Sequence, residues 1–422
     1  MKKLFLFLLF IIVHCTLSIE NCKSQWVQMS NGMGTTQTVN DLASIGSNIF
    51  AGTVNYPFGF VYISSNNGIN WTQTNFNGGP IYSLAVKGNN IFAGTYDNYG
   101  HGFGSVYYST NNGTNWTLTY LNCHGVLALA TSGNNIFAGT LDSGVYLTTN
   151  NGLNWTQSGL NSNTISSLAI SGNNIFAGSN GVFLSTNNGL NWVQTSLNNI
   201  GIRPLVTNGN NIFAGTSTGV FLSTNNGINW NQTTLNTQGI LSLAISGNNI
   251  FAGTYDLNGV YLSTNNGIGW IQKNQGFTSI PLPIINVLHI TNNFVFVGTT
   301  SYFNSVWRRS LSEIIEIKQI SEVVPSSYSL QQNYPNPFNP STKIRFDIAP
   351  VGQRHAFDVR LKIYDILGRE ITTLVNEKLN PGAYEVTFDA RHGGSASFNS
   401  GVYFYRLTAG DFSETKKLVL LK

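Results

Sequence analysis

Twelve residues whose side chains are able to contact a ligand lie between the second and third predicted strands of a repeated unit. They are aromatic, acidic or, in one case, a histidine, and in chain order they are Tyr56, Phe58, Tyr96, Asp97, Tyr99, His101, Phe103, Asp142, Tyr255, Asp256, Tyr302 and Phe303. Aromatic faces combined with a few carboxylates suit a sugar ligand. Aromatic residues form 12% of the chain, so the same rings could instead cover the edges of the hydrophobic core.

The acidic residues in these segments also raise the question of hydrolysis. Glycoside hydrolysis requires two carboxylates at a fixed separation, and Asp97, Asp142 and Asp256 occupy comparable segments. Asp97 and Asp142 lie in adjacent units and could face each other, whereas each Asp could equally cap its own turn. His101 and His124 accompany no GxSxG nucleophile motif, and no phosphate loop or dinucleotide fingerprint is present. The sequence therefore assigns no catalytic residue and predicts no cofactor.

Charge and cysteine content exclude further classes of function. Charged residues form 9% of the chain, against about 25% in an ordinary domain. No cluster of Lys or Arg occurs between Trp26 and Arg309, so neither nucleic acid nor an anionic membrane is expected as a partner. Cys22 and Cys123 lack the spacing of metal ligands, so no metal is predicted, and they either form one disulfide or remain two thiols.

A repeat of roughly forty residues dominates the first three quarters of the chain and predicts a β-propeller. The phrase Asn-Ile-Phe-Ala-Gly-Thr recurs with small changes and ends at Thr53, Thr95, Thr140, Ser179, Thr216, Thr254 and, in a degenerate copy, Thr299. An Ile-x-x-Leu-Ala-Ile strand precedes the phrase, and an aromatic strand and a Trp strand follow it. Four short strands in each unit are typical of a propeller blade.

The number of strands predicts seven blades and a closed ring. Seven Phe-Ala-Gly strands are followed by only six Trp strands, while Trp26 begins a strand that has no unit before it. We expect this N-terminal strand to complete the last blade beside Val306 and Trp307, which would remove an open sheet edge.

The turn before each Trp strand reads Ser/Thr-x-Asn-Asn-Gly-x-x-Trp. Its Asn and Gly residues supply the positive φ angles that a tight turn needs. The element resembles the Asp box of the sialidase-type (BNR) repeat, with Asn in place of Asp, and the resemblance implies a structural turn away from any catalytic face. A sialidase site needs three arginines, but Arg203 is the one Arg between Trp26 and Val306. The asparagines concerned are Asn66, Asn111, Asn150, Asn187, Asn225 and Asn265.

The chain begins with the pattern of a secretory signal peptide. Lys2 and Lys3 precede ten apolar residues, and small residues follow up to Ser18. Ten residues are too few to span a bilayer as a helix, and no other segment is long and apolar enough. We therefore predict a signal peptide at residues 1–18, a propeller at 19–309, a linker at 310–327 and a second domain at 328–422.

Alternating apolar and polar residues in the last 95 residues predict a small Ig-like antiparallel β-sandwich. Several separated motifs occur in it, and the residues that carry them are Tyr334, Pro335, Asn336, Pro337, Phe338, Gly368, Gly401, Tyr403, Lys416 and Lys417. These motifs resemble the type A C-terminal sorting domain of the type IX secretion system. The resemblance implies export to the periplasm, recognition by an outer-membrane translocon, and release or surface attachment after removal of the tail. It also implies a Bacteroidota-type host.

The leading hypothesis is an extracellular or cell-surface, non-catalytic propeller that binds a glycan or a protein. One alternative is a polysaccharide hydrolase similar to the Asp-box xyloglucan-degrading enzymes, which pair two propellers around a cleft where this chain has one. Another is a purely structural component of the cell surface.

Overall fold

The computed structural model describes residues 25–34, 37–96, 104–291, 293–303, 305–314, 317–321, 324–350, 357–379, 381–390 and 399–421. The predicted signal peptide, Cys22, Asp97, Tyr99, His101 and Phe103 lie outside these ranges. The described chain is almost entirely β-structure, with one short 3-10 helix, η1 (Ser301–Phe303), and one short α-helix, α2 (Leu311–Ile314). None of the helices in these ranges has the length and apolar character needed to cross a membrane.

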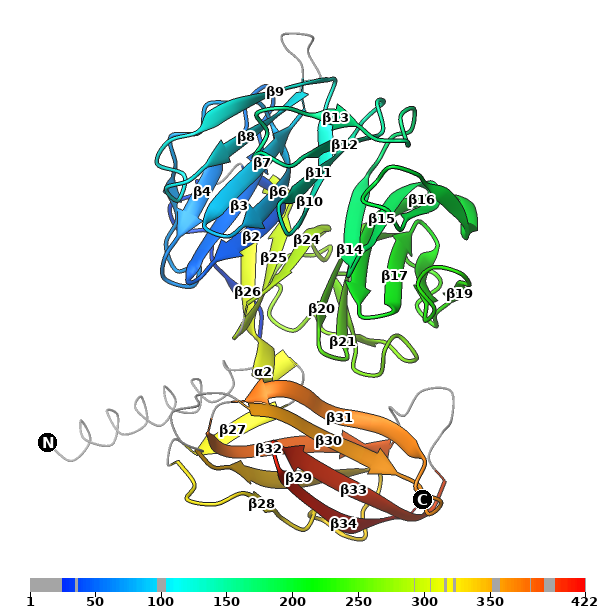
Figure 1. The fold of residues 1–422 in the computed structure, drawn as a ribbon. Coiled ribbons are helices and arrows are strands. Elements are labelled where there is room, and N and C mark those ends of the chain that lie inside the picture. Colours follow the sequence, from blue (N-terminus) through cyan, green and yellow to red (C-terminus); the bar gives the residue numbers. More distant parts are fainter. Residues whose placement is uncertain are drawn as a thin grey trace, which may run out of the picture.

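The repeated part of the chain folds into antiparallel sheets in which the strands follow chain order (Figure 1). The first three sheets are β2 (Thr38–Ile45), β3 (Asn48–Val54), β4 (Val61–Ser64) and β5 (Thr72–Gln73); β6 (Ile81–Lys87), β7 (Asn90–Thr95), β8 (Gly104–Ser109) and β9 (Thr117–Cys123); and β10 (Val126–Ser132), β11 (Asn135–Thr140), β12 (Val145–Thr148) and β13 (Thr156–Gln157).

Two long strands join the next two units into one six-stranded sheet. β15 spans the Phe-Ala-Gly strand and the strand after it, and β16 continues from one unit into the next, pairing first with β15 and then with β17. The sheet contains β14 (Ser167–Ser171), β15 (Asn174–Ser185), β16 (Val193–Asn208), β17 (Asn211–Thr216), β18 (Gly219–Ser223) and β19 (Asn231–Gln232). The following sheet contains β20 (Ile240–Ser246), β21 (Asn249–Thr254), β22 (Val260–Ser263) and β23 (Ile271–Gln272).

The last repeated sheet takes its outer strand from the N-terminus, as the sequence predicted. It contains β24 (Ile285–Ile290), β25 (Phe294–Thr299), β26 (Val306–Ser310) and β1 (Val27–Gln28). Val27 pairs with Arg308, and Gln28 pairs with Trp307. The buried indole of Trp26 donates a hydrogen bond to the Lys273 carbonyl of the preceding sheet at 2.6 Å. The two ends of the repeated region are therefore joined by main-chain pairing.

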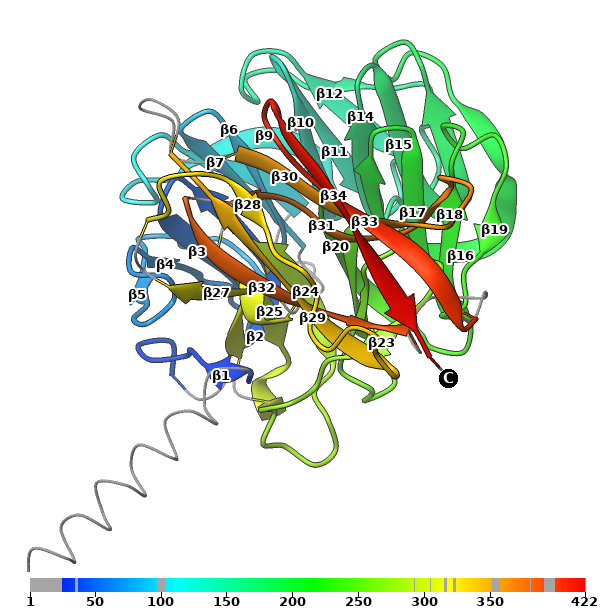
Figure 2. The same cartoon turned by 90° about the horizontal axis from the view of Figure 1, so that it is seen from below.

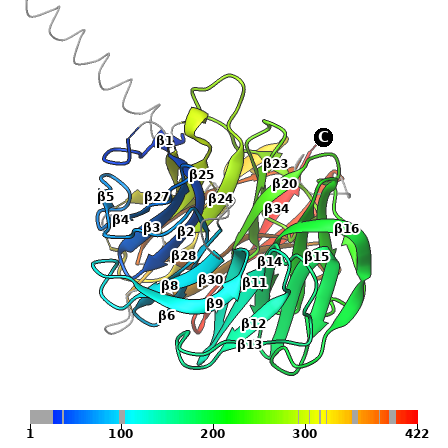
Figure 3. The same cartoon turned by 90° about the horizontal axis from the view of Figure 1, so that it is seen from above.

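A tight contact between neighbouring sheets recurs at the glycine of each Phe-Ala-Gly strand. A Cβ atom added at Gly52 would lie 2.4 Å from Ile81, the residue that begins the next innermost segment. The corresponding distances for the other six glycines lie between 2.3 and 2.7 Å, and the last of them joins Gly298 to Val39 of β2. Innermost segments of successive sheets contact one another, and β24 contacts β2. Figure 3 shows the sheets following one another around a common centre.

The core of each unit is built from the same residues. The Phe of every Phe-Ala-Gly strand is fully buried, and these residues are Phe50, Phe92, Phe137, Phe176, Phe213, Phe251 and Phe296. Because burying a large apolar side chain contributes about 2 kcal/mol, this repeated position is a main source of stability.

The C-terminal residues form two further four-stranded antiparallel sheets. One contains β27 (Ile317–Ser321), β32 (Gly382–Asp389), β29 (Ser341–Ile348) and β28 (Ser329–Leu330); the other contains β31 (Glu370–Leu379), β30 (Phe357–Tyr364), β33 (Gly401–Ala409) and β34 (Phe412–Leu420). Figures 1 and 2 show both sheets on the side of the repeated sheets from which β26 emerges. We expected residues 310–327 to be a linker, but β27 lies within them and pairs with β32, because its backbone groups extend an otherwise open sheet edge.

We predict that Trp26→Ala lowers the stability of the repeated region by about 3 to 5 kcal/mol. The substitution removes a buried ring that stacks on Phe277 at 5.1 Å between centroids and loses the bond to Lys273. Urea unfolding followed by tryptophan fluorescence measures the change, since all eight Trp residues precede the C-terminal sheets. The control is Val27→Ala, because Val27 is the next residue along the chain but is 45% exposed. Equal unfolding midpoints for both variants would contradict the role assigned to Trp26.

Candidate functional site

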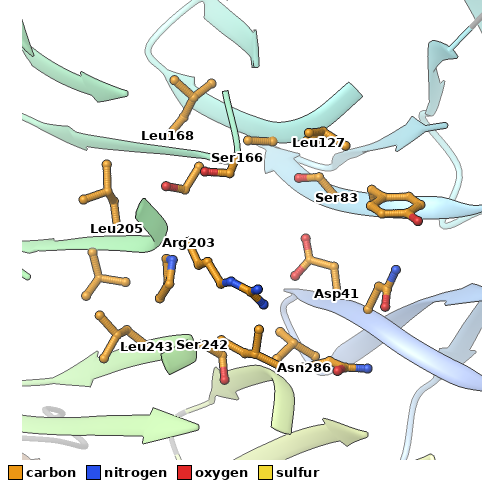
Figure 4. Close-up of a pocket in the computed structure, with 18 of the residues that line it drawn as sticks. Asp41, Ser83, Leu127, Ser166, Leu168, Arg203, Leu205, Ser242, Leu243 and Asn286 are labelled. Carbon is orange, nitrogen blue, oxygen red and sulfur yellow. The ribbon is translucent and has the colours of Figure 1, made fainter. Parts of the chain in front are cut away.

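A cavity of about 250 Å³ lies at the centre of the repeated sheets and is lined by all seven innermost segments. Each segment begins with a buried Ile or Val and contains a Leu three residues later, and the two residues between them line the cavity. These pairs are Asn40-Asp41, Tyr82-Ser83, Leu127-Ala128, Ser166-Ser167, Arg203-Pro204, Leu241-Ser242 and Asn286-Val287. Figure 4 shows side chains from these segments around the cavity.

Asp41 supplies the one carboxylate among the residues that line the cavity. Its oxygens accept hydrogen bonds from the backbone N–H groups of Leu42 at 2.8 Å and of Leu84 at 2.6 Å. Burial raises the pKa of Asp41 to about 7, although these backbone bonds and a bond with Ser83 oppose the shift. The side chain is half-buried on the cavity wall. Asp41 therefore ties β2 to β6 and changes its charge near neutral pH.

Arg203 supplies the one guanidinium group in the cavity lining. Its Cζ atom lies 5.7 Å from the centroid of the Tyr255 ring, a cation–π arrangement. Figure 4 shows Arg203 and Asp41 both directed into the cavity, from different sides. No ion pair joins them within the part of the chain that the structure describes, so both charges remain available to a ligand.

Tyr82 gathers two of the predicted aromatic residues beside the cavity. Its hydroxyl group forms a hydrogen bond with the hydroxyl of Tyr56, and its ring packs edge-on against Tyr96 at 5.4 Å. Burial, with the Tyr56 hydroxyl as the next contribution, raises the pKa of Tyr82. The three rings therefore form a polar-tipped aromatic group at the end of the cavity where the innermost segments begin.

Two predicted acidic residues are engaged by their own loops and do not line the cavity. Asp142 forms an ion pair with His124 and accepts a hydrogen bond from the Ser143 hydroxyl. Although desolvation raises the pKa of Asp142, the bonds from His124 and Ser143 hold it below its ordinary value. Asp256 accepts a hydrogen bond from the Gly239 backbone N–H. The lowered pKa of Asp142 is the opposite of the raised pKa that a general acid needs.

The remaining predicted residues of this set are also not brought to the cavity. Phe58 is 62% exposed in a turn closed by Asn55, and Tyr302 is 90% exposed in η1. The Phe303 carbonyl accepts a hydrogen bond from the Trp307 indole at 2.7 Å. Of the described residues in the predicted set, Tyr56, Tyr96 and Tyr255 are therefore the ones in contact with a cavity residue.

The asparagine turns are alike in all six copies. In each, the side-chain oxygen of the first Asn accepts bonds from a Ser or Thr hydroxyl and from the backbone N–H four residues later, at 2.8 to 3.0 Å. The second Asn has a φ of 55° to 57°, and the Gly that follows has a φ of 80° to 87°. The side-chain oxygen of the first Asn therefore forms its hydrogen bonds within the turn in every copy. These residues are Asn66, Asn111, Asn150, Asn187, Asn225 and Asn265.

The proline-rich motif of the C-terminal sheets holds the last strand in place. The Asn336 side chain accepts a bond from the Val419 backbone N–H at 2.9 Å. Buried Phe338 exchanges backbone bonds with Val419 and Leu421, each at 2.9 Å. Gly368 has a φ of 77° in its turn. The N-terminal part of this domain is thereby joined to β34, which carries Lys416 and Lys417.

Cys123 is buried and free, and its thiol lies 3.4 Å from the Gly104 carbonyl. Burial raises the pKa of the Cys123 thiol to about 11, so the reactive thiolate is scarce at neutral pH. Cys22, the other half of the disulfide considered above, lies outside the described residues.

The two C-terminal sheets match a known family. Residues 332–421 match the family model described as the secretion system C-terminal sorting domain. These residues are a sorting domain. They support export through type IX secretion and a secreted or cell-surface location. No curated protein sequence matches the chain as a whole.

Solved structures similar to this protein include β-propellers. YCF48 from Cyanidioschyzon merolae has a TM-score of 0.53 and 15% identity, over 68% of this chain and 98% of that one. The GH74 enzyme of Niastella koreensis has a TM-score of 0.50 and 19% identity, over 65% and 43%. The extracellular domain of BT4673, a putative hybrid two component system of B. thetaiotaomicron, has a TM-score of 0.54 and 18% identity, over 78% and 47%. At these identities the likeness shows the fold alone, and the Asp-box resemblance stays a prediction.

Asp41, Tyr82 and the cavity-facing position of Arg203 were not among the residues predicted to contact a ligand. One signal was present, because these residues occupy the variable pair in a strand pattern that is otherwise repeated. The strand pattern alone does not say whether the pair faces a filled core or an open space.

We predict that the stability advantage of Asp41→Ser over the unmodified protein grows as the pH rises from 5 to 8. The folded-state pKa of about 7 lies above the ordinary 3.8, so the folded protein binds the extra proton between these values and loses stability as the pH rises through them. Ser is the residue found at this position in three other segments, so the fold accommodates it.

Urea midpoints at pH 5 and pH 8, read by tryptophan fluorescence, measure this difference. Burial lowers the pKa of His289 to about 4, which gives an opposite slope between pH 4 and 6.5, but this effect is common to both proteins and cancels. A difference in midpoint that is the same at both pH values would show that Asp41 does not titrate as assigned.

Proposed function

We propose that this protein is a secreted or cell-surface, non-catalytic binding protein for an extracellular glycan or protein, built on a seven-bladed propeller. In this proposal residues 1–18 are a signal peptide, residues 19–309 the propeller, and residues 328–422 an Ig-like sorting domain recognised by the outer-membrane type IX translocon. The sorting domain at residues 332–421 supports the export route.

The observation that carries the binding role is the cavity with its aromatic surroundings. Seven innermost segments line one cavity, and Tyr56, Tyr96 and Tyr255 contact residues in its wall. Exposed aromatic rings next to a polar cavity provide the apolar contact and the convergent polar groups typical of ligand sites. Tyr255 is 54% exposed, so one such ring is accessible from outside.

A polysaccharide hydrolase is the second candidate, favoured by the fold shared with the GH74 enzyme. Its candidate carboxylates were Asp97, Asp142 and Asp256. Asp142 is paired with His124 and Asp256 with the Gly239 backbone. Both carboxylates therefore serve local contacts, which favours the binding role over hydrolysis.

A glycan array and a protein-capture assay, combined with a reducing-sugar release assay on the same ligands, test the proposal. We expect saturable binding without sugar release, and we expect Tyr255→Ala to weaken binding at least tenfold. The control Tyr120→Ala removes a ring that is 88% exposed on β9 and does not line the cavity, so binding should not change. Sugar release that is lost in Asp142→Asn would establish the hydrolase, and the absence of any binding would favour a structural surface component.

A second prediction concerns export. Removal of residues 328–422 should leave the propeller in the periplasm of a host with type IX secretion, because the translocon then lacks its recognition element. Cell fractionation with antibodies against the propeller measures its location, and a periplasmic marker protein controls for lysis. Normal surface display or release of the truncated protein would refute the sorting assignment.

A further inference from the structure

The residues that line the central cavity differ from segment to segment, whereas the rest of each segment is repeated. All seven segments place Ile or Val before the pair and Leu after it. The pair itself changes each time and includes an amide, a phenol, hydroxyls, an aliphatic chain, a guanidinium and a carboxyl group. The apolar residues on either side of the pair are thus of the same type in every segment, whereas the pair that lines the cavity varies. An asymmetric lining on a nearly symmetric scaffold fits an asymmetric small ligand.

The asymmetry places one positive and one negative group in the same small space. Asp41 on β2 and Arg203 on β16 are the charged residues of the lining. Their segments are three places apart along one side of the ring and four along the other, which puts them on nearly opposite walls. Figure 4 shows both side chains directed into the cavity. Neither charge neutralises the other through an ion pair between described residues.

Each charged group is held in place but retains binding capacity. The Asp41 carboxylate accepts two backbone N–H bonds and forms a bond with Ser83. A carboxylate has about four acceptor sites, so it can still accept a bond from a ligand. Arg203 is covered on one side by the Tyr255 ring, while its five N–H donors can still bind a carboxylate in a bidentate manner. A volume of about 250 Å³ accommodates a small organic molecule, since a water molecule takes about 30 Å³.

We propose that the central cavity binds a small zwitterion, an amino acid with a free carboxylate and a free ammonium group. The carboxylate contacts Arg203, and the ammonium contacts Asp41. Hydroxyl and amide groups of Ser166, Ser242 and Asn286 in the lining surround the rest of the ligand. The site adjoins the aromatic residues that carry the proposed glycan or protein binding, because the Tyr255 ring packs against Arg203.

The charge of Asp41 makes this binding dependent on pH. The ammonium group requires the ionised carboxylate, and with a pKa of about 7 affinity should be about tenfold weaker at pH 6 than at pH 8. The other titratable groups of the cavity wall are Arg203 and Tyr82, and burial raises the pKa of Tyr82 above its ordinary value. His289 on β24 forms a hydrogen bond with Ser44 and does not line the cavity.

Isothermal titration of the full-length protein with a panel of amino acids tests the proposal. The panel contains glycine, L-serine, L-lysine and straight-chain ω-amino acids of increasing length, because the length that bridges the two charges is the quantity sought. Acetate, butyrate, ethylamine and butylamine serve as probes with a single charge. We expect at least one zwitterion to bind tenfold or more tightly than the single-charge probe of the same length.

Substitutions to residues that occupy the same position in other segments distinguish an effect of lost charge from an effect of lost folding. Asp41→Ser and Arg203→Leu place residues that already occupy the same positions elsewhere in the ring, so folding should be retained, and tryptophan fluorescence checks it. Each should weaken zwitterion binding at least tenfold. Leu241→Ser alters the lining without changing charge and should leave affinity within threefold, as should Lys87→Gln, which removes a cation that bonds to Asn134 and Asn151.

Three results would overturn the proposal: no heat of binding for any zwitterion at pH 8, equal affinity for zwitterions and single-charge probes, or unchanged affinity in both charge variants. Its failure is distinguishable from failure of the proposed function. Loss of glycan or protein binding in Tyr255→Ala is measured on a different ligand, and Asp41→Ser leaves Tyr255 and Arg203 in place.

Discussion

The close approach of glycine to a β-branched residue of the next sheet sets the spacing of the repeated region. Any side chain at the glycine would press its Cβ to within 2.3 to 2.7 Å of an Ile or Val, far below an ordinary carbon contact. Because the contact is made seven times and its last member joins Gly298 to Val39, the spacing at each joint is the same. A uniform spacing around a common centre leaves a space of fixed size between the innermost segments, and the cavity occupies it.

The rest of the repeated region contains few charged residues, because its backbone groups and side-chain amides form hydrogen bonds with one another. In each Asn turn the first Asn accepts its hydrogen bonds with a neutral amide oxygen atom, and the second Asn adopts the left-handed region, which Asn tolerates. Trp side chains also contact the preceding sheet: the Trp155 indole donates to the Thr119 hydroxyl at 3.2 Å. Asp41 and Arg203 are thus the two charged residues among those that line the cavity.

The repeated architecture could be predicted from the sequence because its signal is periodic. The four strands of each unit, the buried Phe positions and the N-terminal strand beside Trp307 all follow from the spacing of a few motifs. Residue positions relative to the centre could not be predicted in the same way. Tyr56 and Tyr96 were recognised as loop residues, but Tyr82, which brings them together, lies in a strand that resembles an ordinary core strand. The pairing of β27 with β32 was missed because the five residues of β27, with Ile317 and Ile320 three apart, lack the strict alternation that indicates a strand.

The register of the last repeated sheet determines how the two ends of the cavity differ. Val306 pairs with Gly298, and Ile285 pairs with Thr299, so the start of β26 lies at the same end as the variable pair Asn286-Val287. Ser310 pairs with Phe294 at the opposite end, and the chain leaves there for the sorting domain. The residues that line the cavity and their aromatic neighbours are thus at the end remote from the point of attachment. At that distance the type IX machinery can engage the sorting domain without contact with the strand pairs that shape the cavity.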